Sequence, residues 1–140
     1  MYLIDTNVIS EIRKRDKANP GVASFFRQVV ARDEAIYLSS ISVGELRRGV
    51  ELIRHRGDLP QAGMLETWLN EILDQYRENI LSFDADAAQV WGRLRVPNAE
   101  NEIDKQIAAI ALVNGLIVVT RNTADFEATG VNLRNPFLLD

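Results

Sequence analysis

The chain has 140 residues, of which 46 % are hydrophobic and 26 % charged, the proportions of one ordinary globular domain. It has no cysteine, which excludes disulfides and thiolate metal sites and fits a reducing, cytoplasmic environment. A net charge of −4 argues against binding nucleic acid by bulk attraction. The longest apolar run, residues 107–113, is too short to cross a membrane.

Short apolar runs alternate with amphipathic segments along the chain. We expect strands at residues 2–5, 35–38, 80–83, 116–119 and 131–134. We expect helices at 6–13, at 20–32 after the Asn19-Pro20 start, from Ser42, at 61–76, from Asp84, and at 103–114 ending at Gly115. The second half of the last helix is apolar on nearly every side, which predicts central burial.

The strands are continuous and apolar, as is typical of parallel strands that are covered on both faces. The alternation of strands and helices therefore predicts a single α/β domain over residues 1–140, a three-layer α/β/α sandwich around a short, mostly parallel sheet.

Several polar side chains are expected at one edge of this sheet, because ligands bind at the carboxyl ends of parallel strands. They belong to Asp5, Glu45, Asp104 and the segment Thr120, Arg121, Asn122. Carboxylates that are forced together repel one another unless a cation joins them. Oxygen ligands without His or Cys favour Mg²⁺ or Mn²⁺.

Each acid also has a purely structural interpretation, and the residues alone leave both open. Asp5 can cap the helix that follows it. Ser42 and Glu45 fit an S-x-x-E capping box. Asp104, expected in the first turn of its helix, is favoured there by the helix dipole.

Basic residues are concentrated in the first part of the chain. Residues 1–60 hold ten Lys/Arg and eight Asp/Glu, whereas residues 61–140 hold six and twelve. The clusters at 13–17 and 47–56 suit a polyanion, although solvated helix faces explain them equally simply. His55 lies between two of these arginines and is expected at the surface rather than as a general base.

Four stretches occur in an order and spacing that resemble a known family: YLIDTNVISE (2–11), LSSISVGELRRGV (38–50), IDKQIAAIAL (103–112) and IVVTRNTADF (117–126), followed by NPF (135–137). The chain resembles PIN-domain ribonucleases, specifically the VapC toxins of bacterial toxin–antitoxin pairs and their FitB-like branch. The likeness covers essentially the whole chain and implies the PIN fold for residues 1–140.

The resemblance implies a hydrolase, an endoribonuclease in which Asp5, Glu45 and Asp104 hold Mg²⁺ or Mn²⁺ and the metal activates water. At the family's fourth acidic position this chain has Asn122, which weakens the expectation of a second metal. Asp125 is a weaker candidate ligand and is also typical of a helix-start acid. Supporting roles are expected from Thr6, Asn7, Thr120 and Arg121; the Arg121 side chain either contacts phosphate or pairs with an acid.

The resemblance also implies partners: a VapB-like antitoxin, an RNA substrate with transfer RNA as the expected class, and a second copy in a homodimer, with no membrane involved. A basic antitoxin side chain suits an acidic pocket. Segment 61–76 and the helix with Phe25 and Phe26 are candidate contact surfaces, although such aromatics are more often core.

Two other functions stay open. A non-catalytic partner-binding protein that keeps the PIN fold is favoured by Asn122. An aspartyl phosphatase would usually have a second Asp two residues after the first, where this chain has Asn7.

Overall fold

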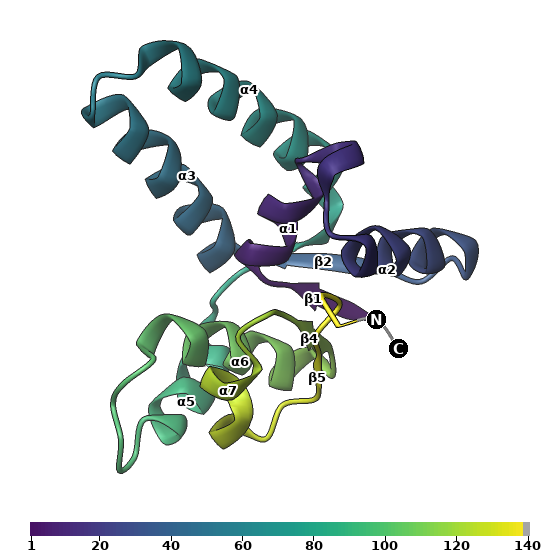
Figure 1. The fold of residues 1–140 in the computed structure, drawn as a ribbon. Coiled ribbons are helices and arrows are strands. Elements are labelled where there is room, and N and C mark those ends of the chain that lie inside the picture. The colour runs from purple at the N-terminus through teal and green to yellow at the C-terminus, as the bar shows by residue number, and fades with distance from the viewer. Residues whose placement is uncertain (139–140) are drawn as a thin grey trace.

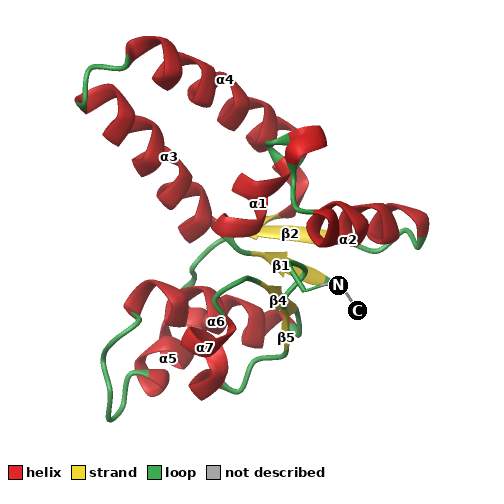
Figure 2. Cartoon of the chain, in the orientation of Figure 1, coloured by secondary structure: helices red, strands yellow, loops and turns green. Residues whose placement is uncertain are grey.

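The computed structural model describes residues 1–138, in which helices cover both faces of a five-stranded parallel sheet (Figures 1 and 2). The spatial order of the strands is β3-β2-β1-β4-β5, and every neighbouring pair is parallel. The strands are β1 (Tyr2–Ile4), β2 (Ile36–Ser39), β3 (Ile80–Leu81), β4 (Ile117–Val119) and β5 (Leu133–Arg134). The α/β/α fold predicted from the sequence is thereby confirmed.

The central strand β1 connects the two halves of the sheet. Tyr2 pairs with Ile36 of β2 on one side and with Ile117 of β4 on the other. Leu3 and Ile4 are completely buried, and their side chains enter different core layers because successive residues of a strand point to opposite faces. A strand covered on both faces needs an unbroken apolar sequence, which is what β1 has.

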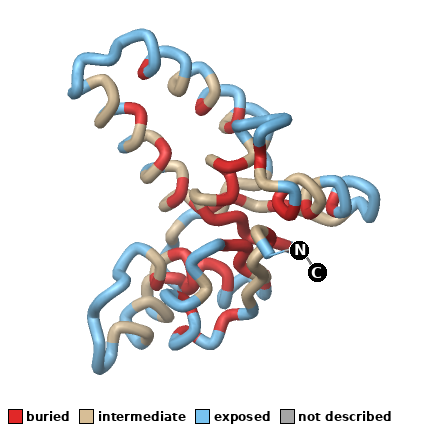
Figure 3. Tube along the Cα trace, in the orientation of Figure 1, coloured by how far each residue is buried: buried red, intermediate tan, exposed pale blue. Residues whose placement is uncertain are grey.

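One face of the sheet is covered by the four N-terminal helices and the other by the three C-terminal ones, with the buried residues concentrated between the layers (Figure 3). The first layer consists of α1 (Thr6–Ile12), α2 (Pro20–Ala31), α3 (Ser40–His55) and α4 (Leu59–Gln75). The second consists of α5 (Ala85–Leu94), α6 (Glu102–Asn114) and α7 (Thr123–Phe126). Short 3₁₀ turns lie at Arg15–Lys17, Arg77–Asn79 and Glu127–Thr129.

Helix α3 begins earlier than the sequence predicted. Its N-cap is Ser39, whose Oγ accepts a hydrogen bond from the Ser42 backbone N at 2.9 Å and donates to the Ser42 Oγ at 3.0 Å. The prediction that Ser42 opens the helix was therefore wrong, and Glu45 lies in the second turn rather than the first. The other predicted boundaries differ from the structure by at most two residues at either end.

Helix α6 is buried in its middle but not along its whole second half. Residues 107–111 are at most 1 % exposed, whereas Leu112 and Val113 are 38 % and 39 % exposed. The expected central burial of the helix is confirmed at residues 107–111, and the last turn reaches the surface before Gly115 ends the helix with φ +65°. None of the helices in residues 1–138 has both the length and the hydropathy of a membrane span.

We expect Ser39→Ala to lower the free energy of unfolding by about 1–2 kcal/mol, because a buried helix cap is lost and the Ser42 N–H is left without its partner. Chemical denaturation of the variant measures this loss. Ser82→Ala, at an exposed loop serine, is the matched control. An equal effect of the two substitutions would contradict the assignment of the cap.

Candidate active site

A pocket of ≈ 280 Å³ lies at the carboxyl edge of the sheet, between the two helical layers. Its wall brings together side chains from four separate parts of the chain. They are Asp5, Thr6 and Asn7 after β1, Glu45 of α3, Ile103, Asp104 and Ile107 of α6, and Asn122 after β4. The three acids singled out in the sequence thus line one pocket.

Asp5 is the most deeply placed of these acids, with only 4 % of its surface exposed. Its Oδ1 accepts a hydrogen bond from the Thr6 backbone N at 2.8 Å, which caps α1. Its Oδ2 accepts from Thr120 Oγ1 at 2.8 Å and from Asn7 Nδ2 at 3.3 Å. The capping interpretation is therefore correct for one oxygen, while the other is held by Thr120 at the end of β4 and by Asn7 of α1.

The loop after β4 is tied to the same carboxylate. Thr120 Oγ1, besides donating to Asp5, accepts hydrogen bonds from the Asn122 backbone N at 3.0 Å and from Asn7 Nδ2 at 3.3 Å. Asn7 Oδ1 accepts from the Arg121 backbone N at 3.1 Å. Asn7 and Thr120 therefore orient Asp5 and fix the direction in which the chain leaves the sheet.

Glu45 and Asp104 differ from Asp5 in that neither carboxylate accepts a protein hydrogen bond within residues 1–138. The capping box proposed for Glu45 is wrong, because Ser39 and not Ser42 caps α3. Asp104 is the third residue of α6, so the dipole interpretation still applies to it. Helix capping thus explains Asp5 in part and Glu45 not at all.

Burial and the charges of neighbouring acids both raise the pKa values of Asp5 and Asp104. Burial raises the pKa of Asp5, against the hydrogen bonds from Thr120 and Thr6, and the Glu45 charge raises it further. Burial also raises the pKa of Asp104 to about 6, with added repulsion from Asp5, Asp125 and Glu45. A positive charge in the pocket would relieve this repulsion.

The chemistry of the donors fits a hard divalent cation, since all the polar atoms are oxygens or amide groups. Within residues 1–138, no three acidic or imidazole side chains are already gathered around a common point in a way that could hold a metal ion. No protein hydrogen bond fixes the carboxylates of Glu45 and Asp104, so their orientation can adjust. The residues that could hold a cation are therefore Asp5, Glu45 and Asp104.

Of the remaining candidates, Asp125 and Arg121 lie around the pocket rather than in its wall. Asp125 acts on Asp104 only through its charge. The exposed Arg121 has its guanidinium 3.9 Å from the centre of the Phe137 ring, and among residues 1–138 it forms no ion pair with an acid, so its contact with phosphate stays a prediction. Asn122 lines the pocket and makes no side-chain cap bond.

Two of the four arginines in the basic cluster at 47–56 are neutralised within the protein. Arg47 pairs with Glu66 at 2.6 Å, and Arg54 pairs with Glu66 at 3.2 Å and also with Glu51. His55, at the end of α3, is exposed, as predicted. The solvated-face interpretation is therefore the better one for this cluster.

Sequence reasoning missed the residues that hold the start of α6 in place. Lys105 is 5 % exposed, and its Nζ donates to the Asn98 carbonyl at 2.7 Å. Trp91 Nε1 donates to the Glu102 carbonyl at 3.2 Å. Both contacts position the turn that carries Asp104. The sequence did offer a sign that Lys105 is buried and bonded: it is a charged residue between the apolar Ile103 and Ile107, on a helix expected to be buried.

Comparison with known proteins shows the family. The PIN-domain sequence profile matches residues 2–132. The chain belongs to the PIN-domain family. This PIN-domain protein is 37 % identical to the plasmid stability protein StbB of Pseudomonas syringae pv. tomato, over 98 % of this chain and 99 % of that relative. It is 33 % identical to the VapC ribonuclease Y4jK of Sinorhizobium fredii, over 98 % of each.

A solved structure agrees with this assignment. The crystal structure of FitAcB from Neisseria gonorrhoeae matches with a TM-score of 0.85 and 34 % identity, over 99 % of this chain and 100 % of that one. The resemblance to the VapC and FitB group, inferred from four sequence motifs, is confirmed, and the chain is a PIN-domain member of that group of toxin ribonucleases.

We expect Asp104→Asn to stabilise the metal-free protein above pH 6 by a few degrees in Tm and to have little effect near pH 4. The pKa of Asp104 is about 6 when folded and 3.8 normally. The folded state therefore keeps a proton that the unfolded state has lost between these pH values, so stability falls as pH rises through this window and stays lower above it.

Thermal unfolding of both proteins at several pH values, with chelator present, tests this expectation. Added Mg²⁺ should stabilise the unsubstituted protein more than Asp104→Asn, because the cation replaces the missing counter-charge. Equal Tm differences at pH 4 and pH 8 would contradict the repulsion that we assign to Asp104.

Proposed function

We propose that this PIN-domain protein is the ribonuclease toxin of a toxin–antitoxin pair and that it hydrolyses RNA phosphodiester bonds with the help of Mg²⁺ or Mn²⁺. The observation that carries the proposal is the pocket in which Asp5, Glu45 and Asp104, from three separate segments, come together and repel one another. The VapC ribonuclease relative, at 33 % identity over nearly the whole chain, supports the same activity.

When bound, a divalent cation would supply a water of lowered pKa and neutralise charge on the phosphate. Asp5 would be the fixed ligand, because Thr120, Asn7 and the Thr6 N–H hold its carboxylate in one orientation. Glu45 from one helical layer and Asp104 from the other would complete the oxygen set. Their mutual repulsion in the metal-free protein makes cation binding favourable.

Asn122 would give this site less negative charge than a fourth carboxylate. Its side chain lines the pocket and is not used for capping, so its amide oxygen is available to the cation or to a water. This composition favours one tightly held cation over two. As substrate we propose transfer RNA, the class expected from the family resemblance.

The proposed antitoxin partner suits both the pocket and the surface near it. A basic side chain in the pocket would neutralise the same carboxylates as a cation. Apolar grooves on the outer helices expose Val30 of α2 at 80 % and Met64 of α4 at 74 %, beside the partly buried Phe26 and Trp68. An antitoxin or a second copy of the chain would cover such surfaces.

We expect Asp5→Asn, Glu45→Gln and Asp104→Asn each to reduce Mg²⁺-dependent RNA cleavage by the purified protein by at least about 100-fold, because each removes a charged ligand. Cleavage of labelled transfer RNA measures this effect, and circular dichroism checks the fold. Asp86→Asn, an exposed acid in the first turn of α5, is the matched control and should retain full activity.

The alternative is a non-catalytic partner-binding protein, for which Asn122 is the favouring feature. Cleavage that is absent at high purity, or that survives both a chelator and Asp5→Asn, would favour this alternative over the nuclease.

A further inference from the structure

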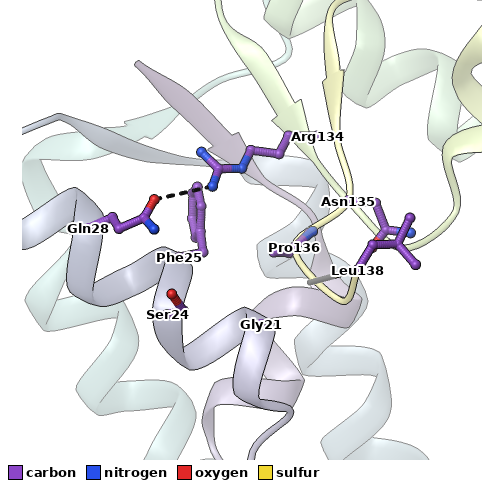
Figure 4. A pocket seen from close by; sticks show the side chains of 8 residues that line it. All are labelled: Gly21, Ser24, Phe25, Gln28, Arg134, Asn135, Pro136 and Leu138. Atoms are coloured by element: carbon purple, nitrogen blue, oxygen red, sulfur yellow. Dashed lines mark hydrogen bonds between the residues drawn. The ribbon is translucent and has the colours of Figure 1, made fainter. Parts of the chain in front are cut away.

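A second pocket lies between α2 and the segment that follows β5 (Figure 4). Its volume is ≈ 320 Å³, and its lining is more polar than that of the grooves on the outer helices. It is lined by Gly21, Ser24, Phe25, Gln28, Arg134, Asn135, Pro136 and Leu138. None of these residues belongs to the carboxylate pocket, so this is a separate site.

Arg134 places a fixed positive charge in this pocket. Its guanidinium lies 4.8 Å from the centre of the Phe25 ring, and its Nη2 donates to Gln28 Oε1 at 3.4 Å, as Figure 4 shows. Gln28 is neutral, and within residues 1–138 no carboxylate lies at ion-pair distance from Arg134. The guanidinium is therefore held in place without being neutralised, and most of its five N–H donors remain for a ligand.

The sheet connects this guanidinium to the carboxylate pocket. The Thr120 backbone N donates to the Arg134 carbonyl at 2.9 Å, and Thr120 Oγ1 donates to Asp5. Because β1, β4 and β5 are consecutive neighbours, two strand spacings separate the Asp5 and Arg134 backbones, roughly 10 Å. A few nucleotides of single-stranded RNA can bridge that distance.

A second guanidinium without an ion pair among residues 1–138, that of Arg121, lies near the same edge of the sheet. Arg121 stacks on Phe137, which follows the pocket residues Asn135 and Pro136. Residues 61–140 hold only six Lys/Arg, and two of these six are Arg121 and Arg134. Residues 61–140 are acidic overall, yet two of their cations, Arg121 and Arg134, lie near the carboxylate pocket. A phosphate that enters this pocket has to approach three carboxylates.

We propose that the Arg134 pocket binds a backbone phosphate of the RNA strand that is cleaved at the carboxylate pocket, a proposal that rests on the proposed nuclease function. The carboxylates repel a polyanion, so the strand needs a cationic anchor nearby. A guanidinium offers parallel N–H donors that match phosphate oxygens. Ser24 contributes a hydroxyl, and Asn135 contributes its amide nitrogen because its Oδ1 accepts from the Phe137 N.

Two substitutions test the pocket in different ways. Arg134→Gln removes the charge but also loosens the packing on Phe25. Gln28→Glu keeps the shape of the side chain and its contacts. It neutralises Arg134, because a carboxylate oxygen takes the place of the amide oxygen that accepts the hydrogen bond from Arg134 Nη2. Arg32→Gln is the matched control, since Arg32 is an exposed arginine at the end of the same helix and lines neither this pocket nor the grooves on the outer helices. Thermal unfolding of each variant separates lost binding from lost folding.

The measurement is the Kd of a short fluorescent single-stranded RNA, by anisotropy in chelator, between about 50 and 200 mM salt. We expect both pocket variants to bind about tenfold more weakly at low salt. The slope of log K against log salt should fall by roughly 0.7, the value for one phosphate contact on a single strand. In Mg²⁺ the two pocket variants should raise KM for cleavage and leave kcat unchanged, while Arg32→Gln should alter neither.

Unchanged Kd and KM in Gln28→Glu would overturn the pocket assignment and leave the nuclease proposal intact, provided that Asp5→Asn is inactive. A chain that neither binds nor cleaves RNA would overturn both. Arg134-dependent binding of a poly-glutamate peptide that is tighter than that of RNA would assign the pocket to an acidic protein partner and contradict the proposal.

Discussion

The structure depends on a carboxylate that is buried at the end of its central strand. Removing an ionised group from water is costly unless hydrogen bonds or charges compensate. Asp5 receives three such bonds, from Thr6, Asn7 and Thr120. These bonds join the first helix, the first strand and the end of β4, so the same contacts that stabilise the charge also define the edge of the sheet. Structural and functional demands on Asp5 therefore coincide.

The charge of Asp5 has consequences for its neighbours. Glu45 and Asp104 approach it from opposite helical layers and receive no hydrogen bonds from residues 1–138. A protein selected for stability alone would place donors or apolar groups at these positions. The uncompensated charge is thus best explained by a positive group that joins the site, and a cation or a partner's basic side chain would compete for the same oxygens.

Much of the fold could be predicted from local sequence, because the continuous apolar strands and the turn after Asp5 follow from nearest neighbours along the chain. The start of α3 was misplaced because Ser39, Ser40 and Ser42 all have capping side chains, and the end of β2 at Ser39 selects among them. The exposure of the last turn of α6 depends on where the sheet ends, which composition does not encode.

The lining of the candidate pocket was predictable in part, because a strand end marked Asp5 and positions near helix starts marked Glu45 and Asp104. Contacts across the sheet were not predictable. Lys105 bonds a loop carbonyl, and the Arg134 guanidinium meets α2, more than 100 residues away in sequence. Contacts between residues that are far apart in the chain leave no periodic pattern in the sequence, because tertiary packing alone brings the two residues together.

The strand order has a consequence for synthesis on the ribosome. β1 is made first but lies in the middle of the sheet, and one of its two neighbours, β4, begins at Ile117. Thr120, which holds Asp5, is therefore translated after most of the polypeptide has emerged. A nascent chain therefore cannot assemble the carboxylate pocket until the end of β4 has been made.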